Sequence, residues 1–441
     1  MSSSETTLDP TDQGLKRALP ARFVLAVTVG GIIGLGILRG PGEIAAVVRD
    51  PYLYLVLWLL GGLFVLLSTV VVVELVGMTP RSGGIYPLVR HAYGPFSGFV
   101  IGWVDWLSFV ADIALKAVVV VEFVGILLPA VTPWQPLLAI MVTTIFAAIQ
   151  LRGIALGAAI QQFATAVIGL IVVGFSLLLL FAGPVDIADL PPAPAMITGL
   201  GAWSLVVATI IFTYDGWLYP AYFSGEVKGG AGAVARSCIK GIGIVIVLYL
   251  LLNAAMISSV PLSALAGKEL ALSRALELAV SPAVANAVVF AALFILLSQQ
   301  NLLYMGAPRV IHALAVDGLA TKRVQAVGRG GNPVFAVLVT WIVSVSLILI
   351  GDFKFLVLLC VFFFVILYLV LIVGVIILRR REPDSPRPYR AWGHPYSTAV
   401  CLVGWTIITG FQAVAERETA IYALAMVAIA WPVYRFLIRK P

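Results

Sequence analysis

Long apolar stretches are the feature of this sequence that most limits how the chain can fold. A helix needs about 20 apolar residues to cross the hydrocarbon core of a bilayer. Of the 441 residues, 61% are hydrophobic and only 11% are charged, whereas soluble proteins carry roughly 25% charged residues. We therefore predict an all-α integral membrane protein with twelve transmembrane helices. The predicted spans are 22–47, 53–78, 95–128, 135–150, 157–182, 199–223, 241–260, 283–306, 333–351, 355–378, 396–414 and 420–437.

The loops between these spans share their positive charge unevenly. If the N-terminus is cytoplasmic and every span crosses once, most of the 28 lysines and arginines fall on the cytoplasmic side. Such an excess is typical of cytoplasmic loops, and it accounts for the net charge of +7 without a nucleic-acid partner. The polar tail 1–21 lacks the apolar core of a signal peptide. We predict a multi-pass protein of the inner (plasma) membrane with both termini in the cytoplasm.

Two of the spans contain residues that disfavour a continuous helix. The first holds GGIIGLGILRGPG, from Gly30 to Gly42, and the sixth holds FTYDGW, from Phe212 to Trp217. Each glycine costs a helix roughly 1 kcal/mol relative to alanine. Interruptions at matching positions five spans apart indicate an inverted repeat with a binding site between its halves. The expected units are a first repeat at 22–182, a second repeat at 199–378 and two additional helices at 396–438.

A broken helix inside a membrane leaves backbone groups that need partners. The half-helix that begins near Gly36 would point N–H groups and a positive dipole end into the gap, where a carboxylate can bind. The half-helix that ends near Ile32 and Ile33 would leave carbonyl oxygens for an ammonium group. Because glycine lets a ligand approach the backbone, Gly34 and Gly36 are candidate binding residues. The alternative is that such glycines only allow close packing of helices.

Ionisable residues within spans are costly and usually functional. In the third span, Asp112 and Lys116 are four positions apart and share a helix face, either as a packing pair or as part of the coupling mechanism. Asp105, near the inner end of that span, is expected to reach water. Asp215, beside the second interruption, either accepts hydrogen bonds from the unwound backbone or selects cationic side chains. Glu226, at the inner end of the sixth span, is expected to join the ion pair of a gate.

Four stretches occur in order along the chain: GGIIGLGIL, PRSGGIYPLVRHAYGPFSGFVIGW, FTYDGWLYPAYFSGEV and PRVIHALAVDGL. They are similar to motifs of the amino acid–polyamine–organocation superfamily, and the chain most resembles bacterial relatives of the L-type amino acid transporters. The resemblance implies a LeuT-like fold of two inverted five-helix repeats that works by alternating access. It also implies that the backbone at Gly34 and Gly36 holds a substrate carboxylate, with the carbonyl groups of Ile32 and Ile33 near the amine.

The resemblance extends to single residues, with three departures. Phe212 matches an aromatic gate beside the substrate, and Asn301 matches an asparagine of the eighth span. Leu35 stands where the family has a serine between the paired glycines, and Ile168 stands where several relatives have a lysine in place of a sodium ion. The segment 127–136 contains no cysteine, so the disulfide-linked heavy chain of animal relatives is not expected as a partner.

The predicted surroundings of the gap indicate the substrate. Leu35, Phe212, Tyr214 and Trp217 are mostly apolar, so we predict an exchanger or symporter for small to medium neutral L-amino acids. One alternative is a proton-coupled transporter of cationic amino acids, amines or polyamines, with Asp215 as the selector. A remote alternative is an intramembrane aspartyl protease, which needs a second facing aspartate in a suitable context. Apart from this the sequence predicts no enzyme, cofactor or metal site, and a homodimer is compatible with it.

Overall fold

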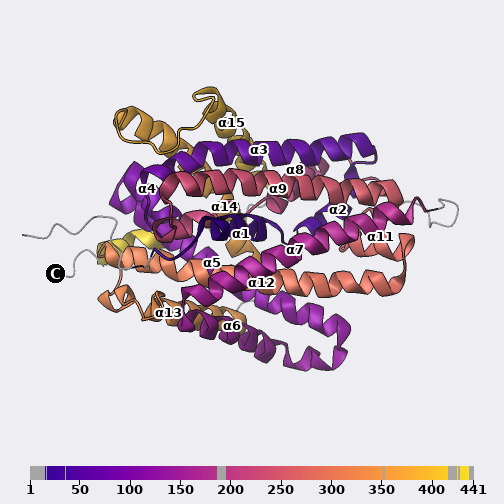
Figure 1. Cartoon of the computed structure of the whole chain (residues 1–441), viewed down its shortest axis with the longest axis horizontal. Helices are drawn as coiled ribbons and strands as arrows, with labels where there is room; N and C mark the ends of the chain where they lie inside the picture. The colour runs from indigo at the N-terminus through magenta and orange to yellow at the C-terminus, as the bar shows by residue number, and fades with distance from the viewer. Residues whose placement is uncertain are drawn as a thin grey trace, which may run out of the picture.

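The computed structural model describes residues 15, 17–34, 36–185, 195–350, 353–415, 425 and 428–436. The regular elements within these ranges are helices, accompanied by two isolated β-bridges that pair Leu19 with Val227 and Val327 with Pro333. The long helices run side by side along the long axis of the molecule (Figure 1). Helices suit a membrane because each satisfies its own backbone polar groups.

Most of the predicted spans coincide with one long helix, and the first and sixth are each divided in two. The span helices are α1 (Ala21–Ile32), α2 (Gly36–Val47), α3 (Pro51–Met78), α5 (Pro95–Leu127), α6 (Gln135–Arg152), α7 (Ile154–Ala182), α8 (Leu200–Thr213), η3 (Tyr219–Glu226), α9 (Gly230–Ser259), α12 (Pro282–Val316), α13 (Val334–Ile350), α14 (Phe353–Arg381) and α15 (Tyr396–Ala415). Shorter helices connect them: α4 (Ile85–Tyr93), η1 (Pro129–Trp134), α10 (Leu262–Leu265), α11 (Ala271–Ala279) and η4 (Lys322–Gln325). Of the predicted twelfth span, residues 425 and 428–436 are helical and the rest lies outside the described residues.

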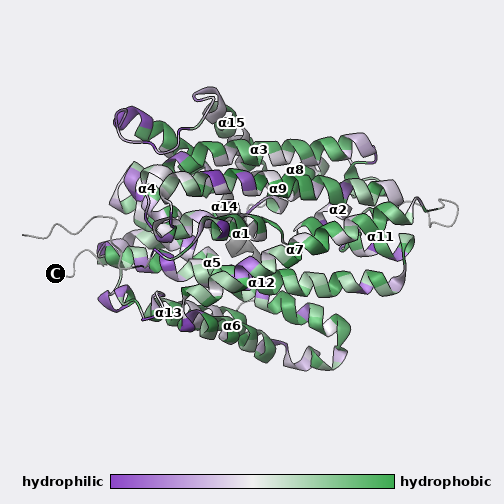
Figure 2. Cartoon of the chain, viewed as in Figure 1, coloured by the Kyte–Doolittle hydropathy of each residue, from purple (hydrophilic) through white to green (hydrophobic). Residues whose placement is uncertain are grey.

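Several helices have the length and composition of membrane spans. Among the described residues, 6 helical stretches are long and apolar enough to cross a bilayer: Ala21–Val47, Pro51–Met78, Pro129–Arg152, Ile154–Ala182, Gly230–Ser259 and Pro282–Val316. Figure 2 shows apolar residues along most of the length of α3, α7 and α9, and polar residues gathered at the end that carries α4 and the connection between α14 and α15. The chain is therefore a multi-pass membrane protein.

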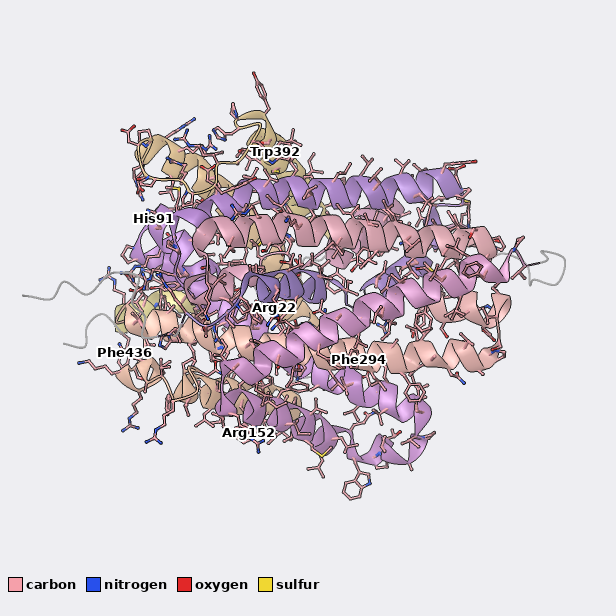
Figure 3. The ribbon with its side chains drawn as sticks, viewed as in Figure 1. Arg22, His91, Arg152, Phe294, Trp392 and Phe436 are labelled. Carbon is pink, nitrogen blue, oxygen red and sulfur yellow. The ribbon has the colours of Figure 1, made fainter. Side chains whose placement is uncertain are left out.

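Ion pairs hold the end of the bundle that carries α4. Glu74 of α3 is 1% exposed and accepts hydrogen bonds from Arg379 at 2.5 Å and from Arg387 at 3.1 Å. His91, which lies at this end in Figure 3, is hydrogen-bonded through its Nε2 atom to the carboxylate of Glu382 at 3.1 Å. These contacts dock the connection between α14 and α15 onto α3 and α4.

Two helices extend ten or more residues beyond the spans that the sequence predicted. Helix α9 begins at Gly230 instead of 241, and α12 continues to Val316 instead of ending at 306. Proline within a helix removes one backbone hydrogen bond, yet α12 continues past Pro308 because its C-terminal part is packed inside the protein. Arg309 is 1% exposed and His312 is 0% exposed, so both belong to a buried helix and not to a cytoplasmic loop.

Helices α1 and α2 lie inside the bundle. Helix α1 packs against α7 and α9, and α2 packs against α8; Figure 1 shows the short α1 near the centre of the molecule. Phe23, Val27 and Ile37 have no exposed surface. Because protein surrounds these half-helices, the backbone freed between them can be satisfied by protein groups instead of facing lipid.

Candidate functional site

The two interruptions fall where the sequence predicted them. Helix α1 ends at Ile32, Ile33 adopts an extended conformation, and α2 begins at Gly36. Helix α8 ends at Thr213, a turn covers residues 214–218, and η3 begins at Tyr219. Leu35, a predicted pocket residue, lies outside the described residues.

The two interruptions touch each other, and glycine makes this contact possible. Gly216 has a positive φ of 99°, and a Cβ atom there would lie 2.5 Å from the carbonyl oxygen of Gly31. A Cβ atom on Gly36 would lie 2.8 Å from the Cα atom of Thr213. Any larger residue at 36 or 216 would push the backbones of the two spans apart. Close approach between the broken spans is therefore one reason for glycine at these positions.

A single tyrosine hydroxyl connects the two interruptions. Tyr249 of α9 is buried, and its hydroxyl oxygen lies 3.0 Å from the carbonyl oxygen of Ile32 and 3.1 Å from that of Thr213. These carbonyls end the half-helices α1 and α8, where intrahelical donors are missing. Tyr249 was not among the residues predicted from the sequence, although its hydroxyl in the middle of the apolar span 241–260 is a signal that could have identified it.

The polar side chain beside the first interruption is Gln299 of α12. Its Nε2 atom lies 3.4 Å from the carbonyl oxygen of Gly31, and a Cβ atom on Gly34 would meet that Nε2 atom at 2.6 Å. The predicted Asn301 instead donates to the backbone oxygen of Gly157 at 3.0 Å and to Gln161 at 3.1 Å, both on α7. Asn301 thus ties α12 to α7, and Gln299 is the amide near the break.

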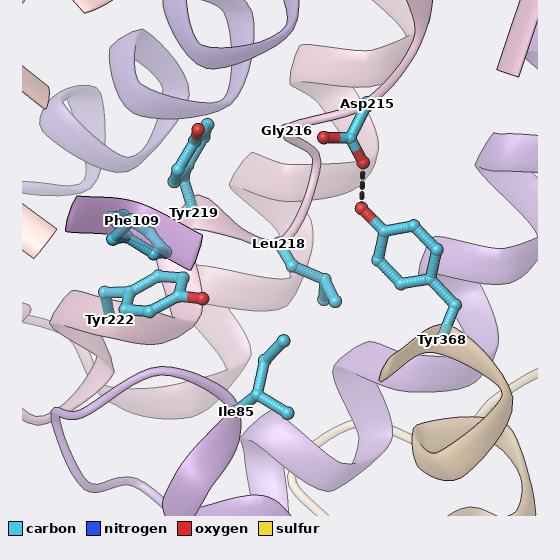
Figure 4. A pocket seen from close by; sticks show the side chains of 8 residues that line it. All are labelled: Ile85, Phe109, Asp215, Gly216, Leu218, Tyr219, Tyr222 and Tyr368. Atoms are coloured by element: carbon cyan, nitrogen blue, oxygen red, sulfur yellow. Dashed lines mark hydrogen bonds between the residues drawn. The ribbon is translucent and has the colours of Figure 1, made fainter. Parts of the chain in front are cut away.

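A small cavity of about 20 Å³, room for about one water molecule, lies beside the interruption of the sixth span (Figure 4). Asp215 lines it and accepts a hydrogen bond from the hydroxyl of Tyr368 on α14. The ring of Phe109 packs against that of Tyr222 with centroids 4.7 Å apart. The lining residues are Ile85, Phe109, Asp215, Gly216, Leu218, Tyr219, Tyr222 and Tyr368. The cavity therefore combines one carboxyl group with four aromatic rings.

The other predicted aromatic residues do not line this cavity. Tyr214 is buried, donates to the backbone oxygen of Trp58 at 3.1 Å and packs against Tyr249. Trp217 is 1% exposed and stacks behind Tyr368, with ring centroids 4.9 Å apart. Phe212 is 54% exposed and is not among the residues that line the cavity.

Glu226 forms a buried ion pair at the C-terminal end of the sixth predicted span. Its carboxylate accepts two hydrogen bonds from Arg309, at 2.6 and 2.8 Å, and one from the hydroxyl of Ser82 at 3.0 Å. Arg309 also donates to Asn332 at 3.1 Å. Paired hydrogen bonds between arginine and a carboxylate are strong and directional. This cluster joins η3 to α12 and to the segment before α4.

The third span supplies two acidic groups with different surroundings. Asp112 and Lys116 form an ion pair along α5 and interact electrostatically with Asp215. Asp105 does not reach water as predicted: it is 0% exposed, and it accepts a hydrogen bond of 2.7 Å from Tyr222. Asp105 is kept away from water because η3 and α4 cover it. The positions of these two elements cannot be predicted from the sequence of the third span alone.

Known proteins resemble this chain along most of its length. The amino acid permease family matches residues 23–431. A serine/threonine exchanger of Bacillus subtilis is 27% identical over 250 residues, and the match spans only 56% of this chain and 56% of the exchanger. A branched-chain amino acid permease of Lactococcus lactis is 26% identical over 453 residues, covering 95% of this chain and 94% of the permease. The b(0,+)-type amino acid transporter 1 of Mus musculus is 26% identical over 378 residues, covering 83% of this chain and 77% of that protein. With both helix interruptions in place and the family match spanning nearly all of its helices, this chain belongs to the amino acid permease family, a family of transporters and not of enzymes.

Proposed function

We propose that the protein carries α-amino acids across the membrane by alternating access, and that the substrate binds where the two interruptions meet. The observation that supports this most directly is the contact between the breaks, with Gly216 against Gly31 and the hydroxyl of Tyr249 between Ile32 and Thr213. The first turn of α2 offers N–H groups to a carboxylate, as helix N-termini do. We further propose twelve spans, a five-plus-five inverted repeat, and cytoplasmic termini in the plasma membrane.

The proposed substrates are small to medium neutral L-amino acids. The carboxyl group of Asp215 already accepts a hydrogen bond from Tyr368, which leaves less of it free to pair with a cationic side chain. Ile85, Phe109 and Leu218 give the rest of the cavity apolar surface. One relative is named as an exchanger of serine and threonine, and another as a permease for branched-chain amino acids. All of these amino acids have uncharged side chains of small to medium size.

A cationic substrate is the second candidate, and one observation favours it. Tyr219, Tyr222 and Tyr368 line the same cavity as Asp215. Aromatic faces attract ammonium and guanidinium groups, by about 0.5–2 kcal/mol per contact. A cationic side chain would have to displace the hydroxyl of Tyr368 from Asp215 before it could pair with the carboxylate.

Uptake into liposomes separates these candidates. Purified protein would be reconstituted with unlabelled serine inside, and entry of labelled alanine, serine, leucine, arginine and glutamate would be measured. We expect alanine, serine or leucine to enter fastest, and decarboxylated amines to compete poorly because they lack the carboxylate. Arginine as the best substrate would instead support the second candidate, and an amine that competes as well as its parent amino acid would contradict the carboxylate site.

A matched pair of glycine variants tests the location of the site. Gly216→Ala should abolish uptake, because the added methyl group meets the Gly31 backbone at 2.5 Å and the residue has a φ of 99°. Gly169→Ala on α7 has nothing within 4 Å of the added atom and should transport normally. Normal uptake by both variants would show that the contact between the breaks is not needed.

A further inference from the structure

Asp105 differs from the other buried acidic side chains of the described residues. Glu74, Asp112 and Glu226 each pair with a lysine or arginine. Asp105 is 0% exposed, takes part in none of the ion pairs formed by the described residues, and has an Oδ2 atom without a hydrogen-bond partner. Its Oδ1 atom accepts the 2.7 Å hydrogen bond from the hydroxyl of Tyr222.

The groups that face Asp105 are neutral. Tyr222 from η3 and Tyr368 from α14 interact with it, and α4 brings the backbone N–H of Ile85 close to the carboxyl group. Helices α12 and α13 also pack on α5, but their described side chains form no ion pair with Asp105. An isolated charge in such a place is far costlier than a neutral group. The carboxylic acid, with its proton on Oδ2, fits this environment.

Asp105 is connected through one hydroxyl to the cavity beside the interruption of the sixth span. Figure 4 shows Tyr222 on the cavity wall beside Phe109 and Tyr219, and its hydroxyl donates to Asp105. Four residues further on, Glu226 belongs to the ion pair that joins the inner end of η3 to Arg309 of α12. A movement that separates η3 from α12 would break this pair and open a path for water to Asp105.

We propose that Asp105 is a proton-binding site, and that the transporter closes around its substrate only when this site holds a proton. The inference rests on the proposed function, because it concerns the closing step of that transport cycle. In an open state, a hydronium ion from the solvent gives its proton to the carboxylate, so that an O–H bond forms on Oδ2 and a water molecule is left. The neutral acid is then enclosed with the substrate. After opening on the other side, the O–H bond breaks, the proton returns to water, and the hydrated carboxylate remains.

We expect amino acid exchange by the wild type to require a proton, and we expect this requirement to be lost when the carboxyl group of Asp105 is replaced. Exchange of labelled for unlabelled amino acid, with equal pH on both sides, should slow as pH rises, by up to about tenfold per pH unit for one required proton. Asp105→Asn, whose amide imitates the neutral acid, should exchange at a rate independent of pH. Asp50→Asn is the matched control: it removes an exposed carboxylate that caps α3, and it should keep the wild-type profile.

Two further measurements cover the case in which Asp105→Asn does not fold. Tyr222→Phe removes a hydrogen bond that favours the carboxylate, so the proton should bind more tightly and the fall in rate should move to higher pH. The infrared difference spectrum between wild type and Asp105→Asn, or between wild type and Tyr222→Phe if the first variant is lost, should contain the C=O stretch of a protonated carboxylic acid at neutral pH.

The outcomes distinguish this inference from the proposed function. A wild-type exchange rate that does not change with pH, or an Asp105→Asn variant that retains the wild-type profile, overturns the proton site and leaves amino acid transport intact. Absence of the protonated carboxyl band also overturns it, whatever the transport result. Failure of every amino acid to exchange in the wild type, with the band present, overturns the proposed function instead.

Discussion

Replacing Tyr249 by phenylalanine would remove one hydroxyl that serves both interrupted spans. That hydroxyl lies 3.0 Å from the carbonyl oxygen of Ile32 and 3.1 Å from that of Thr213. The phenylalanine ring would keep the packing against Trp58 and Tyr214, whose ring centroids lie 6.0 and 5.0 Å away. The variant therefore isolates the hydrogen bonds from the rest of the side chain.

The expected loss follows from these two contacts. Hydrogen bonds between helices of a membrane protein contribute about 0.6 kcal/mol on average. The single O–H proton of Tyr249 is shared between the two carbonyl oxygens, so its loss gives a lower estimate of about 0.6 kcal/mol. A buried acceptor left without a donor costs about 1–3 kcal/mol. Because Tyr249 and both carbonyls are inside the protein, we expect Tyr249→Phe to lower the free energy of unfolding by about 1–3 kcal/mol.

Equilibrium unfolding in mixed detergent micelles measures this change. Tyr214→Phe is the matched control, because the hydroxyl of this neighbouring tyrosine donates to a single acceptor, the backbone oxygen of Trp58 at 3.1 Å, and its loss leaves one carbonyl without a donor instead of two. The control should lose about half as much stability. If Tyr249→Phe is no less stable than Tyr214→Phe, the idea that one hydroxyl fastens both interruptions would be refuted.

Three other predictions follow from ion pairs and exposed positions. Lys116→Met should destabilise the protein by about 3–5 kcal/mol in a thermal or detergent unfolding assay, because it leaves Asp112 buried without its partner; combining it with Asp112→Leu should recover most of the loss if the pair only serves packing. Glu269→Cys, exposed in the connection between α10 and α11, should react with an impermeant thiol reagent added outside intact cells, and labelling only after permeabilisation would contradict the proposed topology. Burial acts to raise the pKa of Glu382, but hydrogen bonds from arginine and histidine neighbours outweigh it and hold the pKa below its usual value. The stability contributed by Glu382 should therefore be complete above about pH 4.3, the pKa of an unperturbed glutamate, and should be lost as the pH falls through the lower pKa of the folded state. In Glu382→Gln, the melting temperature should fall less steeply with decreasing pH over this acidic range.

Features that depend on neighbours along the chain could be predicted from the sequence. Apolar length located the helices, and the glycines from Gly30 to Gly42 together with the stretch Phe212 to Trp217 located both interruptions. The four-residue spacing of Asp112 and Lys116 predicted that they share a helix face, and they form an ion pair. Such signals are local, since helix geometry alone relates residues three or four positions apart.

Features that depend on contacts between distant segments were decided only by the tertiary structure. Tyr249 is 217 positions from Ile32, and Tyr368 is 153 positions from Asp215, yet each pair is joined by a hydrogen bond. The same packing buries Asp105 beneath η3 and places Gln299, instead of Asn301, beside the first interruption. Hydropathy and spacing determine which segments become helices and where they break. The hydrogen-bond partner of each polar group depends on which helix faces it. The relative positions of the helices depend in turn on side-chain packing throughout the bundle, which the sequence of one segment does not specify.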